Sequence, residues 1–428
     1  MKIAFKTFGC KANSVDTDTL YLEAKRRGYE IVSEDEWADT YVINSCTVTS
    51  HADRDARVQV NKYKRQNPKA LVGVIGCYAQ VAKSELLAIP EVDFVLGTAD
   101  KLSILDHLSQ SLAGQSPERD QVKPTSGFLP ETFRGSRYSR ASIKIQDGCN
   151  FSCAFCIIPQ ARGRSRSLGP DLILKQIDDA YAQGFEEIIL TGIHLAHYGW
   201  DINTSLNELL RGIFASPAGP RVRISTLDPF EFSDDLLDWL GTEKRLCPHF
   251  HIALQSGSDE ILKRMRRIYR AQEFIDVTRK IHDRNPDTFV GVDIIVGFPG
   301  ETEEAFQQTV SVLKNSFWSK LHVFSFSLRA GTRAQALDGH LHPSIITERS
   351  HRLRELSQQR YQEFLKSQIG KQKDVLLERP SSKHDGIWLG HTENYLPTYS
   401  RLKNGIPKQI ISSRIAEAEG ERVWTAAR

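Results

Sequence analysis

The chain has 428 residues, of which 40% are hydrophobic and 25% are charged, and its formal net charge is +3. These values are typical of a soluble globular protein with two or three domains, and so small a net charge does not by itself indicate nucleic acid. No stretch approaches eighteen consecutive apolar residues, and the first residues lack the apolar core of a secretory signal, so we expect no membrane span. The seven cysteines are few and odd in number, which argues against a secreted disulfide scaffold and favours a cytoplasmic protein.

Residues 1–112 alternate short apolar runs with helical segments, which is the pattern of strands and crossover helices in a parallel sheet. The sequence therefore predicts an α/β fold that begins with a doubly wound parallel-sheet domain. The first helix is expected over Val15–Arg27, with Ser14 as its N-cap and Gly28 just past its end. The expected strands are Ile3–Phe8, Tyr41–Asn44, Leu71–Ile75 and Phe94–Leu96.

Three cysteines of this region, Cys10, Cys46 and Cys77, each come just after one of the expected strands. In a parallel sheet the loops that follow the strands lie at one edge, where ligands bind. We therefore expect these three thiols, far apart in the sequence, to converge in space, and we call them the open triplet. The alternative is three unrelated buried thiols.

The next region, residues 113–136, is polar and rich in Pro, Gly, Ser and Gln, as linkers are. Residues 137–366 again alternate strands with helices such as Asp171–Gln183 and Ala271–Arg284, and this pattern predicts a partial TIM-like (β/α)6 barrel with its chemistry at the carboxyl ends of the strands. The expected barrel strands are Ala141–Gln146, Glu187–Thr191, Arg221–Ser225, His249–Leu254, Thr288–Ile295 and His322–Phe326.

The last region, residues 367–428, has the short strands and turns of a small β-barrel. Trp388, Tyr395 and Tyr399 are interleaved with polar residues there, which is typical of a barrel that binds nucleic acid. The alternative is a structural cap.

A second, compact triplet has the spacing Cys-x3-Cys-x2-Cys and consists of Cys149, Cys153 and Cys156. A structural zinc site would need a fourth ligand, usually as two Cys-x2-Cys pairs, and none lies nearby. Iron–sulfur clusters are normally held by four thiolates, so three thiolates indicate a cluster with one open coordination position.

Two basic segments could neutralise phosphates, and the alternative for each is a solvated surface. The first flanks the compact triplet and contains Arg134, Arg137, Arg140, Lys144, Arg162, Arg164 and Arg166. The second contains Lys263, Arg264, Arg266, Arg267 and Arg270.

The compact triplet, within GCNFSCAFCIIP, resembles the signature of the radical S-adenosylmethionine (SAM) superfamily. This resemblance implies a [4Fe-4S] cluster whose fourth iron chelates SAM, and reductive cleavage of SAM to a 5′-deoxyadenosyl radical. In such enzymes the cofactor performs the difficult step, and the protein orients it and excludes water.

The whole chain resembles a narrower family, the radical SAM methylthiotransferases. FGCKANSVDTD, INSCTV, VIGCYAQ, LQSGSDEILKRMRR, DIIVGFPGET and GHTENY all look like its motifs. The resemblance implies an N-terminal methylthiotransferase domain whose Cys10, Cys46 and Cys77 hold a second, auxiliary [4Fe-4S] cluster for the inserted sulfur. It also implies a C-terminal RNA-binding TRAM domain, a tRNA substrate, a sulfur donor and an electron donor such as flavodoxin or ferredoxin. We expect a monomer.

TGIHLAHYG, RISTLDP and FKTFGCKAN resemble most the branch that adds a methylthio group to C2 of threonylcarbamoyl-adenosine beside the anticodon. The alternatives are the branches that act on isopentenyl-adenosine of tRNA or on a ribosomal-protein aspartate, and a non-catalytic RNA-binding iron–sulfur sensor. One departure is that Ala330 and Arg333 stand where the family usually has prolines.

Six residues at or just after the ends of the barrel strands are expected to contact SAM, with strand-end packing as the alternative for each. They are Thr191, Gly192, Ser225, Gln255, Asp293 and Gly297. His194 and His197 flank the same edge and are interpreted as hydrogen-bonding residues. Cys247 lies outside both triplets and is interpreted as a small buried hydrophobic residue.

Overall fold

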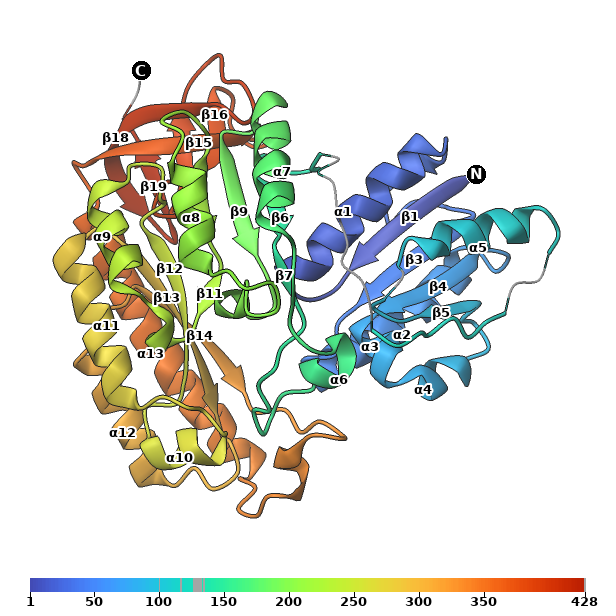
Figure 1. The fold of residues 1–428 in the computed structure, drawn as a ribbon, viewed down its shortest axis with the longest axis horizontal. Helices are drawn as coiled ribbons and strands as arrows, with labels where there is room; N and C mark the ends of the chain where they lie inside the picture. Colours follow the sequence, from blue (N-terminus) through green and yellow to red (C-terminus); the bar gives the residue numbers. More distant parts are fainter. Residues whose placement is uncertain (100, 116–117, 126–132, 134, 427–428) are drawn as a thin grey trace.

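The computed structural model describes residues 1–99, 101–115, 118–125, 133 and 135–426 (Figure 1). Figure 1 shows three parts: an N-terminal α/β domain, a larger curved set of strands covered by helices, and a small barrel at one end of that larger part. The described residues contain no helix that is both long and apolar enough to cross a bilayer.

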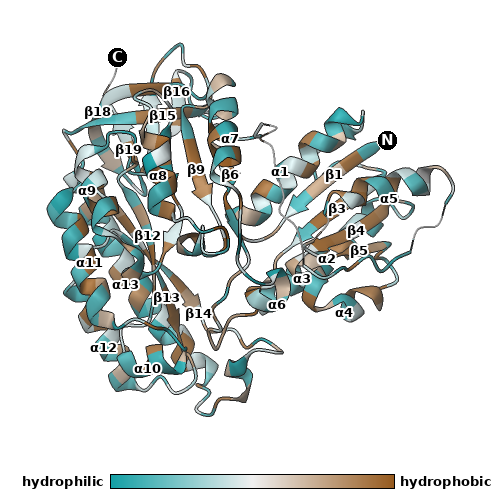
Figure 2. Ribbon diagram, viewed as in Figure 1, coloured by the Kyte–Doolittle hydropathy of each residue, from teal (hydrophilic) through white to brown (hydrophobic). Residues whose placement is uncertain are grey.

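The N-terminal domain is built on five parallel strands in the order β2-β1-β3-β4-β5. Buried apolar side chains fill both faces of this sheet, and the strands are hydrophobic while the helix surfaces are mixed (Figure 2). The doubly wound parallel sheet predicted from the sequence is thus confirmed. Its strands are β1 (Lys2–Thr7), β2 (Glu30–Ile31), β3 (Thr40–Ser45), β4 (Leu71–Gly76) and β5 (Phe94–Leu96). Its helices are α1 (Lys11–Arg26), α2 (Ser50–Gln66), α3 (Cys77–Val81), α4 (Lys83–Leu87) and α5 (Ser103–Leu112).

Helix α1 begins one turn earlier than the sequence predicts. Cys10, not Ser14, is the N-cap, and the Ser14 N–H donates to the Cys10 carbonyl at 3.1 Å within the first turn. Gly9, with φ of +104°, lets the chain leave β1 and enter the helix within three residues. This early start places Cys10 at the sheet edge itself.

The chain between α5 and the larger part is not wholly without sheet structure. The Val95 N–H donates to the Arg119 carbonyl, and the Gln121 N–H donates to the Val95 carbonyl, both at 2.9 Å. This pairing extends the edge of the N-terminal sheet. Residues 126–132 and Arg134, within the expected linker and basic segment, lie outside the described residues.

The larger part contains two parallel sheets, in the orders β10-β9-β6 and β11-β12-β13-β14. Ser225 separates β10 from β11, so the two sheets form one interrupted row of six strand positions, and the partial TIM-like (β/α)6 arrangement is confirmed. The strands are β6 (Ala141–Lys144), β9 (Glu187–Thr191), β10 (Arg221–Ile224), β11 (Thr226–Leu227), β12 (His249–Gln255), β13 (Phe289–Val296) and β14 (Lys320–Ser325). A small hairpin of β7 (Gln146–Asp147) and β8 (Arg166–Ser167) follows β6.

Helices cover the outer side of these strands, as Figure 1 shows. They are α7 (Pro170–Ala182), α8 (Leu206–Phe214), α9 (Asp234–Thr242), α10 (Asp259–Arg264), α11 (Ala271–Arg284), α12 (Glu303–Lys314) and α13 (Pro343–Ser367). The short α6 (Ile158–Arg162) lies in the connection between β7 and β8, just after the compact triplet. Helices α8, α9 and α12 have Ser or Thr side-chain N-caps that fit local sequence signals, such as Ser233 accepting from the Leu236 N–H.

The C-terminal part is a closed barrel in the order β15-β16-β17-β19-β18, which confirms the small β-barrel predicted from the sequence. Its strands are β15 (Gln372–Pro380), β16 (Ile387–Thr392), β17 (Pro397–Arg401), β18 (Ile410–Glu419) and β19 (Arg422–Thr425). Trp388, expected among the RNA-binding aromatics, is instead only 9% exposed and packs in the barrel core. Tyr395 and Tyr399 remain partly exposed, and the Tyr399 ring lies tilted against Trp424 with ring centres 4.6 Å apart.

A buried ion-pair network joins the N-terminal domain to the (β/α)6 part. Asp16 of α1 binds Lys101 and Lys144, each at 2.6 Å, and Arg162 at 3.5 Å. Arg162 and Lys144 also pair with Asp147, at 2.8 and 3.1 Å. Burial disfavours the Asp16 carboxylate, but the three surrounding cations outweigh this effect and hold its pKa below the ordinary value.

This network changes the interpretation of the basic segment around the compact triplet. Lys144 and Arg162 are fully buried in ion pairs, Arg140 pairs with Glu187 and Glu378, and Arg137 pairs with Asp18. These cations therefore hold parts of the protein together. In the second segment, by contrast, Lys263, Arg266 and Arg270 are exposed.

Replacing Asp16 with asparagine should strongly destabilise the protein. Asp16→Asn keeps the shape of the side chain but leaves buried cations without their shared partner, which costs about 3–5 kcal/mol in comparable cases. Urea unfolding should show a clearly lower midpoint. Asp35→Asn is the matched control, because Asp35 is exposed and pairs with Lys62 at the surface, and its midpoint should stay nearly unchanged. Equal midpoints for the two variants would contradict a stabilising role of the network.

Candidate active site

The open triplet lies at one edge of the N-terminal sheet, as the topology predicts. Cys46 directly follows β3, Cys77 is the first residue of α3 after β4, and Cys10 joins β1 to α1. A Cβ atom on Gly9 would lie 2.6 Å from Cβ and 2.8 Å from Sγ of Cys46, so glycine is required for the two loops to approach this closely.

The surroundings of the open triplet fit a metal cluster. All three cysteines are free thiols. Burial, opposed in part by backbone N–H groups and reinforced by nearby Cys77 and Cys10, raises the pKa of Cys46 to about 11. Arg162 donates from Nε to the Cys77 sulfur at 3.3 Å, a contact that favours a negatively charged sulfur. Thiolates this close together repel each other. A bound metal stabilises them, and the thiols release their protons when it binds.

The compact triplet lines a cavity of about 260 Å³ at the carboxyl ends of the barrel strands. Burial raises the pKa of Cys149 to about 11 and of Cys156 to about 12, and charge on Cys153 opposes ionisation of both. Arg267 donates to the Cys153 sulfur at 3.3 Å and is held by an ion pair with Asp228. Each triplet thus has one arginine fixed against one of its sulfurs, which fits two clusters of negative charge.

A second cavity, of about 480 Å³, lies where all three parts of the protein meet. Cys10 and Lys11 reach it from the N-terminal domain, and His391 and Tyr395 reach it from the C-terminal barrel. Thr226 and Asp293 line both this cavity and the one with the compact triplet, so the two cavities adjoin. We call the larger one the junction cavity.

The structure places five of the six expected SAM contacts on these cavities. Thr191, Gly192 and Ser225 line the junction cavity, Gln255 lines the cavity of the compact triplet, and Asp293 lines both. Gln255 has φ of +62°, the left-handed region, at the end of β12. Gly297 lies apart, in the turn after β13 (φ +78°), where its N–H donates to Glu301 and a Cβ would collide with Ile346. Whether the six residues bind SAM remains a prediction.

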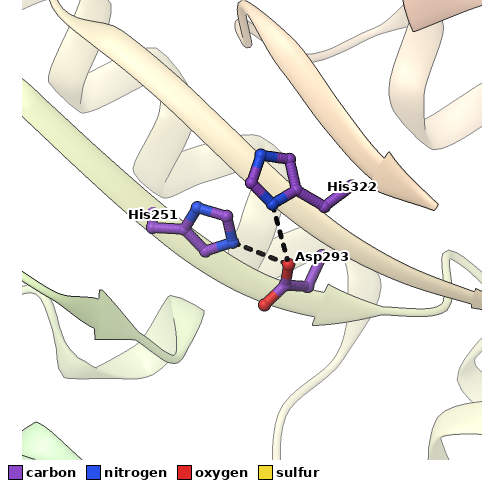
Figure 3. Close-up of side chains that lie close together, drawn as sticks. All are labelled: His251, Asp293 and His322. Atoms are coloured by element: carbon purple, nitrogen blue, oxygen red, sulfur yellow. Dashed lines mark ion pairs between the residues drawn. The ribbon is translucent and has the colours of Figure 1, made fainter. Parts of the chain in front are cut away.

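Asp293 is held by two imidazoles, as Figure 3 shows. His251 Nε2 lies 2.7 Å and His322 Nδ1 lies 3.8 Å from the same carboxylate oxygen. The potential ligand atoms of these three residues lie within 4.8 Å of one another, which is close enough to hold a metal ion. Burial and nearby His251 lower the pKa of His322, Asp293 opposes them, and the charges of Lys320 and Lys11 lower it further. Because these two lysines would also repel a divalent cation, the three residues make a poor metal site.

The two histidines after β9 behave differently from each other. His194 Nε2 lies 3.3 Å from Asp228 and 3.4 Å from Glu231, as expected for a hydrogen-bonding residue. His197 is fully buried, neither ring nitrogen has a partner among the described residues, and it stacks on His194 at 4.0 Å. Burial and the neighbouring His194 lower the pKa of His197 to about 4, with Asp228 opposing them, so His197 packs as a neutral ring. Cys247 is buried, as expected.

Several residues of the site were not singled out from the sequence. Lys11 follows Cys10 directly, which is a signal that could have been noticed, because a strand-end position next to one ligand lies at the same edge. Arg223 carried no such signal, and Tyr395 was singled out only as an aromatic residue of the expected RNA-binding barrel. They meet only because the C-terminal barrel docks on β10, where Arg223 lies 4.6 Å from the centre of the Tyr395 ring.

Comparison with known proteins first shows the class of protein to which the chain belongs. Residues 2–97 match the family described as "Uncharacterized protein family UPF0004", and residues 143–313 match the radical SAM superfamily. Among solved structures, the radical SAM methyltransferase TsrM from Kitasatospora setae aligns with a TM-score of 0.57 at 17% identity, over 78% of this chain and 76% of that chain. This likeness concerns the fold alone.

Curated relatives then identify the family. The chain is 36% identical to "Threonylcarbamoyladenosine tRNA methylthiotransferase MtaB" of Bacillus subtilis, over 97% of this chain and 94% of the relative. It is 40% identical to the protein of the same name from Aquifex aeolicus, over 88% and 93%. It is also 33% identical to "tRNA-2-methylthio-N(6)-dimethylallyladenosine synthase" of Methylacidiphilum infernorum, over 99% and 94%. The chain belongs to the radical SAM tRNA methylthiotransferase family.

Substituting one cysteine of the open triplet should remove half of the iron. Cys46→Ala deletes one of three thiolates, so we expect a fall from about eight to about four irons per chain after anaerobic reconstitution. Cys247→Ala is the matched control, because Cys247 is buried like Cys46 but belongs to neither triplet. It should retain about eight irons. Loss of iron in the control alone would refute the assignment of the open triplet.

Proposed function

We propose that the protein adds a methylthio group to C2 of threonylcarbamoyl-adenosine in tRNA, next to the anticodon, by radical SAM chemistry with two [4Fe-4S] clusters. The single observation that carries this proposal is the juxtaposition of the two triplets. Cys10 of the open triplet lines the junction cavity, the compact triplet lines the adjoining cavity, and Asp293 and Thr226 line both.

The residues present fit the cofactors. Cys149, Cys153 and Cys156 would hold the cluster that binds SAM, and Cys10, Cys46 and Cys77 would hold the auxiliary cluster. When bound, the first cluster and SAM would supply the reductive radical chemistry, and the auxiliary cluster would carry the sulfur that is inserted. Thr191, Gly192, Ser225, Gln255 and Asp293 line the space where SAM would lie, and we propose them as its contacts.

The protein's own residues would position the reaction and exclude water. Arg267 and Arg162 donate to one sulfur of each triplet and are themselves fixed by Asp228 and Asp147. Fixed guanidinium groups favour negative charge on the sulfurs without having to reorganise. The C-terminal barrel closes the junction cavity on one side through His391 and Tyr395, which reduces the water near the reacting carbon.

The wider assignments follow from the family. We propose an N-terminal methylthiotransferase domain at 1–112, a linker at 113–136, a radical SAM domain at 137–366 and a TRAM-like RNA-binding domain at 367–428. A tRNA substrate, a sulfur donor and a reductant such as flavodoxin or ferredoxin would be its partners. The protein would act in the cytoplasm, where tRNA is modified, and as a monomer.

The nucleosides of cells that lack this chain would test the proposal. Mass spectrometry of their digested tRNA should show methylthio-threonylcarbamoyl-adenosine lost and threonylcarbamoyl-adenosine retained, while methylthio-isopentenyl-adenosine is unchanged. The cells should be complemented with the wild-type chain and, as the matched inactive control, with Cys153→Ala. Loss of the isopentenyl product instead would indicate the other tRNA branch, and an unchanged profile would refute tRNA as the substrate.

A further inference from the structure

Lys11 brings an unpaired positive charge into the junction cavity. The ammonium group lies 5.9 Å from the centre of the Tyr395 ring, and among the described residues Lys11 forms neither an ion pair nor a hydrogen bond through its side chain. The other lysine of the cavity, Lys320, pairs with Glu421 at 3.2 Å. The Lys11 side chain is exposed where it lines the cavity, so its charge is accessible to a ligand. A positive charge without a protein partner favours a ligand that carries an anion.

The nearest carboxylates are already occupied. Glu187 is fully buried and pairs with Arg140, Arg221 and Arg223 at 2.6–2.9 Å. Asp293, the acidic residue that lines the cavity, is held by His251 and His322. Neither carboxylate can therefore neutralise Lys11 without losing a partner of its own.

Tyr395 maintains this positive field. Its backbone is in the left-handed region, with φ of +68°, which turns it from the C-terminal barrel toward the cavity. Arg223 and Arg140 lie 4.6 and 5.2 Å from the centre of its ring. Lys11 and two guanidinium groups thus lie around one aromatic ring, so the field at the cavity wall attracts anions.

The relatives' names describe two kinds of substituent on adenosine, and they differ in charge. A threonylcarbamoyl group carries a carboxylate and a hydroxyl, whereas a dimethylallyl group is a hydrocarbon. A hydrocarbon in this cavity would displace water from Lys11 without supplying an anion. We propose that Lys11 binds the carboxylate of the threonine substituent and thereby selects threonylcarbamoyl-adenosine, an inference that rests on the proposed function.

Binding of synthetic anticodon stem-loops to the complete chain would test this role. One stem-loop carries threonylcarbamoyl-adenosine, and the second carries the same group with its carboxylate converted to an amide. Wild-type protein should bind the acid at least about tenfold more tightly, which is the size expected for a hydrogen-bonded charge pair. Lys11→Met should bind both equally, at the affinity of the wild type for the amide. Backbone phosphates are identical in the two RNAs, so their contribution cancels.

Two control variants distinguish the lost charge from general damage. Lys11→Arg keeps a cation and should retain a preference for the acid. Lys175→Met removes an exposed lysine on α7 that lines neither cavity, and it should behave as wild type. Iron content and SAM affinity of Lys11→Met should equal those of the wild type. SAM affinity is measured because the carboxylate of SAM is the other anion that Lys11 could bind.

A Lys11→Met variant that keeps the full preference for the acid would overturn the inference, as would equal binding of acid and amide by the wild type. A weakened affinity of Lys11→Met for SAM together with an intact preference for the acid would overturn it in favour of SAM as the anion. The same samples report the proposed function separately, through formation of the methylthio nucleoside by the loaded wild-type enzyme. Absence of that product with an intact acid preference would refute the reaction but not the carboxylate site.

Discussion

The buried network around Asp16 sets the positions of the two triplets relative to each other. Asp16 lies on α1, the helix that starts at Cys10, and its cationic partners Lys144 and Arg162 belong to the (β/α)6 part. Arg162 also donates to Cys77, so one side chain links the interdomain ion pairs to a candidate cluster ligand. Charges buried this deeply tolerate little displacement, because a cation moved away from Asp16 would lose part of its compensation in a place that water cannot reach.

A second contact supports the same arrangement from the opposite side of the site. Arg329, in the loop after β14, pairs with Asp53 of α2 at 2.6 Å, and Ser327 bonds to the start of that helix. This is the loop in which Ala330 and Arg333 replace the prolines usual in the family, and it remains in contact with the N-terminal domain without them. The domain is thus held at both α1 and α2.

Much of this arrangement could be predicted from the sequence, and the exceptions share a physical cause. Parallel topology alone requires the loops after β1, β3 and β4 to meet, so Cys10, Cys46 and Cys77 could be grouped without a structure. Lys144 and Arg162 looked like part of an RNA-binding surface because a residue type does not reveal a partner such as Asp16, more than a hundred residues away. Trp388 and Tyr395 were given the same RNA-binding role for the same reason: only the closed barrel shows that Trp388 packs inside it and that Tyr395 lines the cavity.

The central claim is that both triplets act at one place on one substrate. The most direct test is to give reduced, SAM-supplied Cys46→Ala protein a stem-loop with threonylcarbamoyl-adenosine and to quantify both 5′-deoxyadenosine and the methylthio nucleoside. We predict that the variant still forms 5′-deoxyadenosine, because the compact triplet is intact, and forms no methylthio nucleoside. Methylthio nucleoside at the wild-type level would show that the open triplet takes no part in the reaction and would contradict the account.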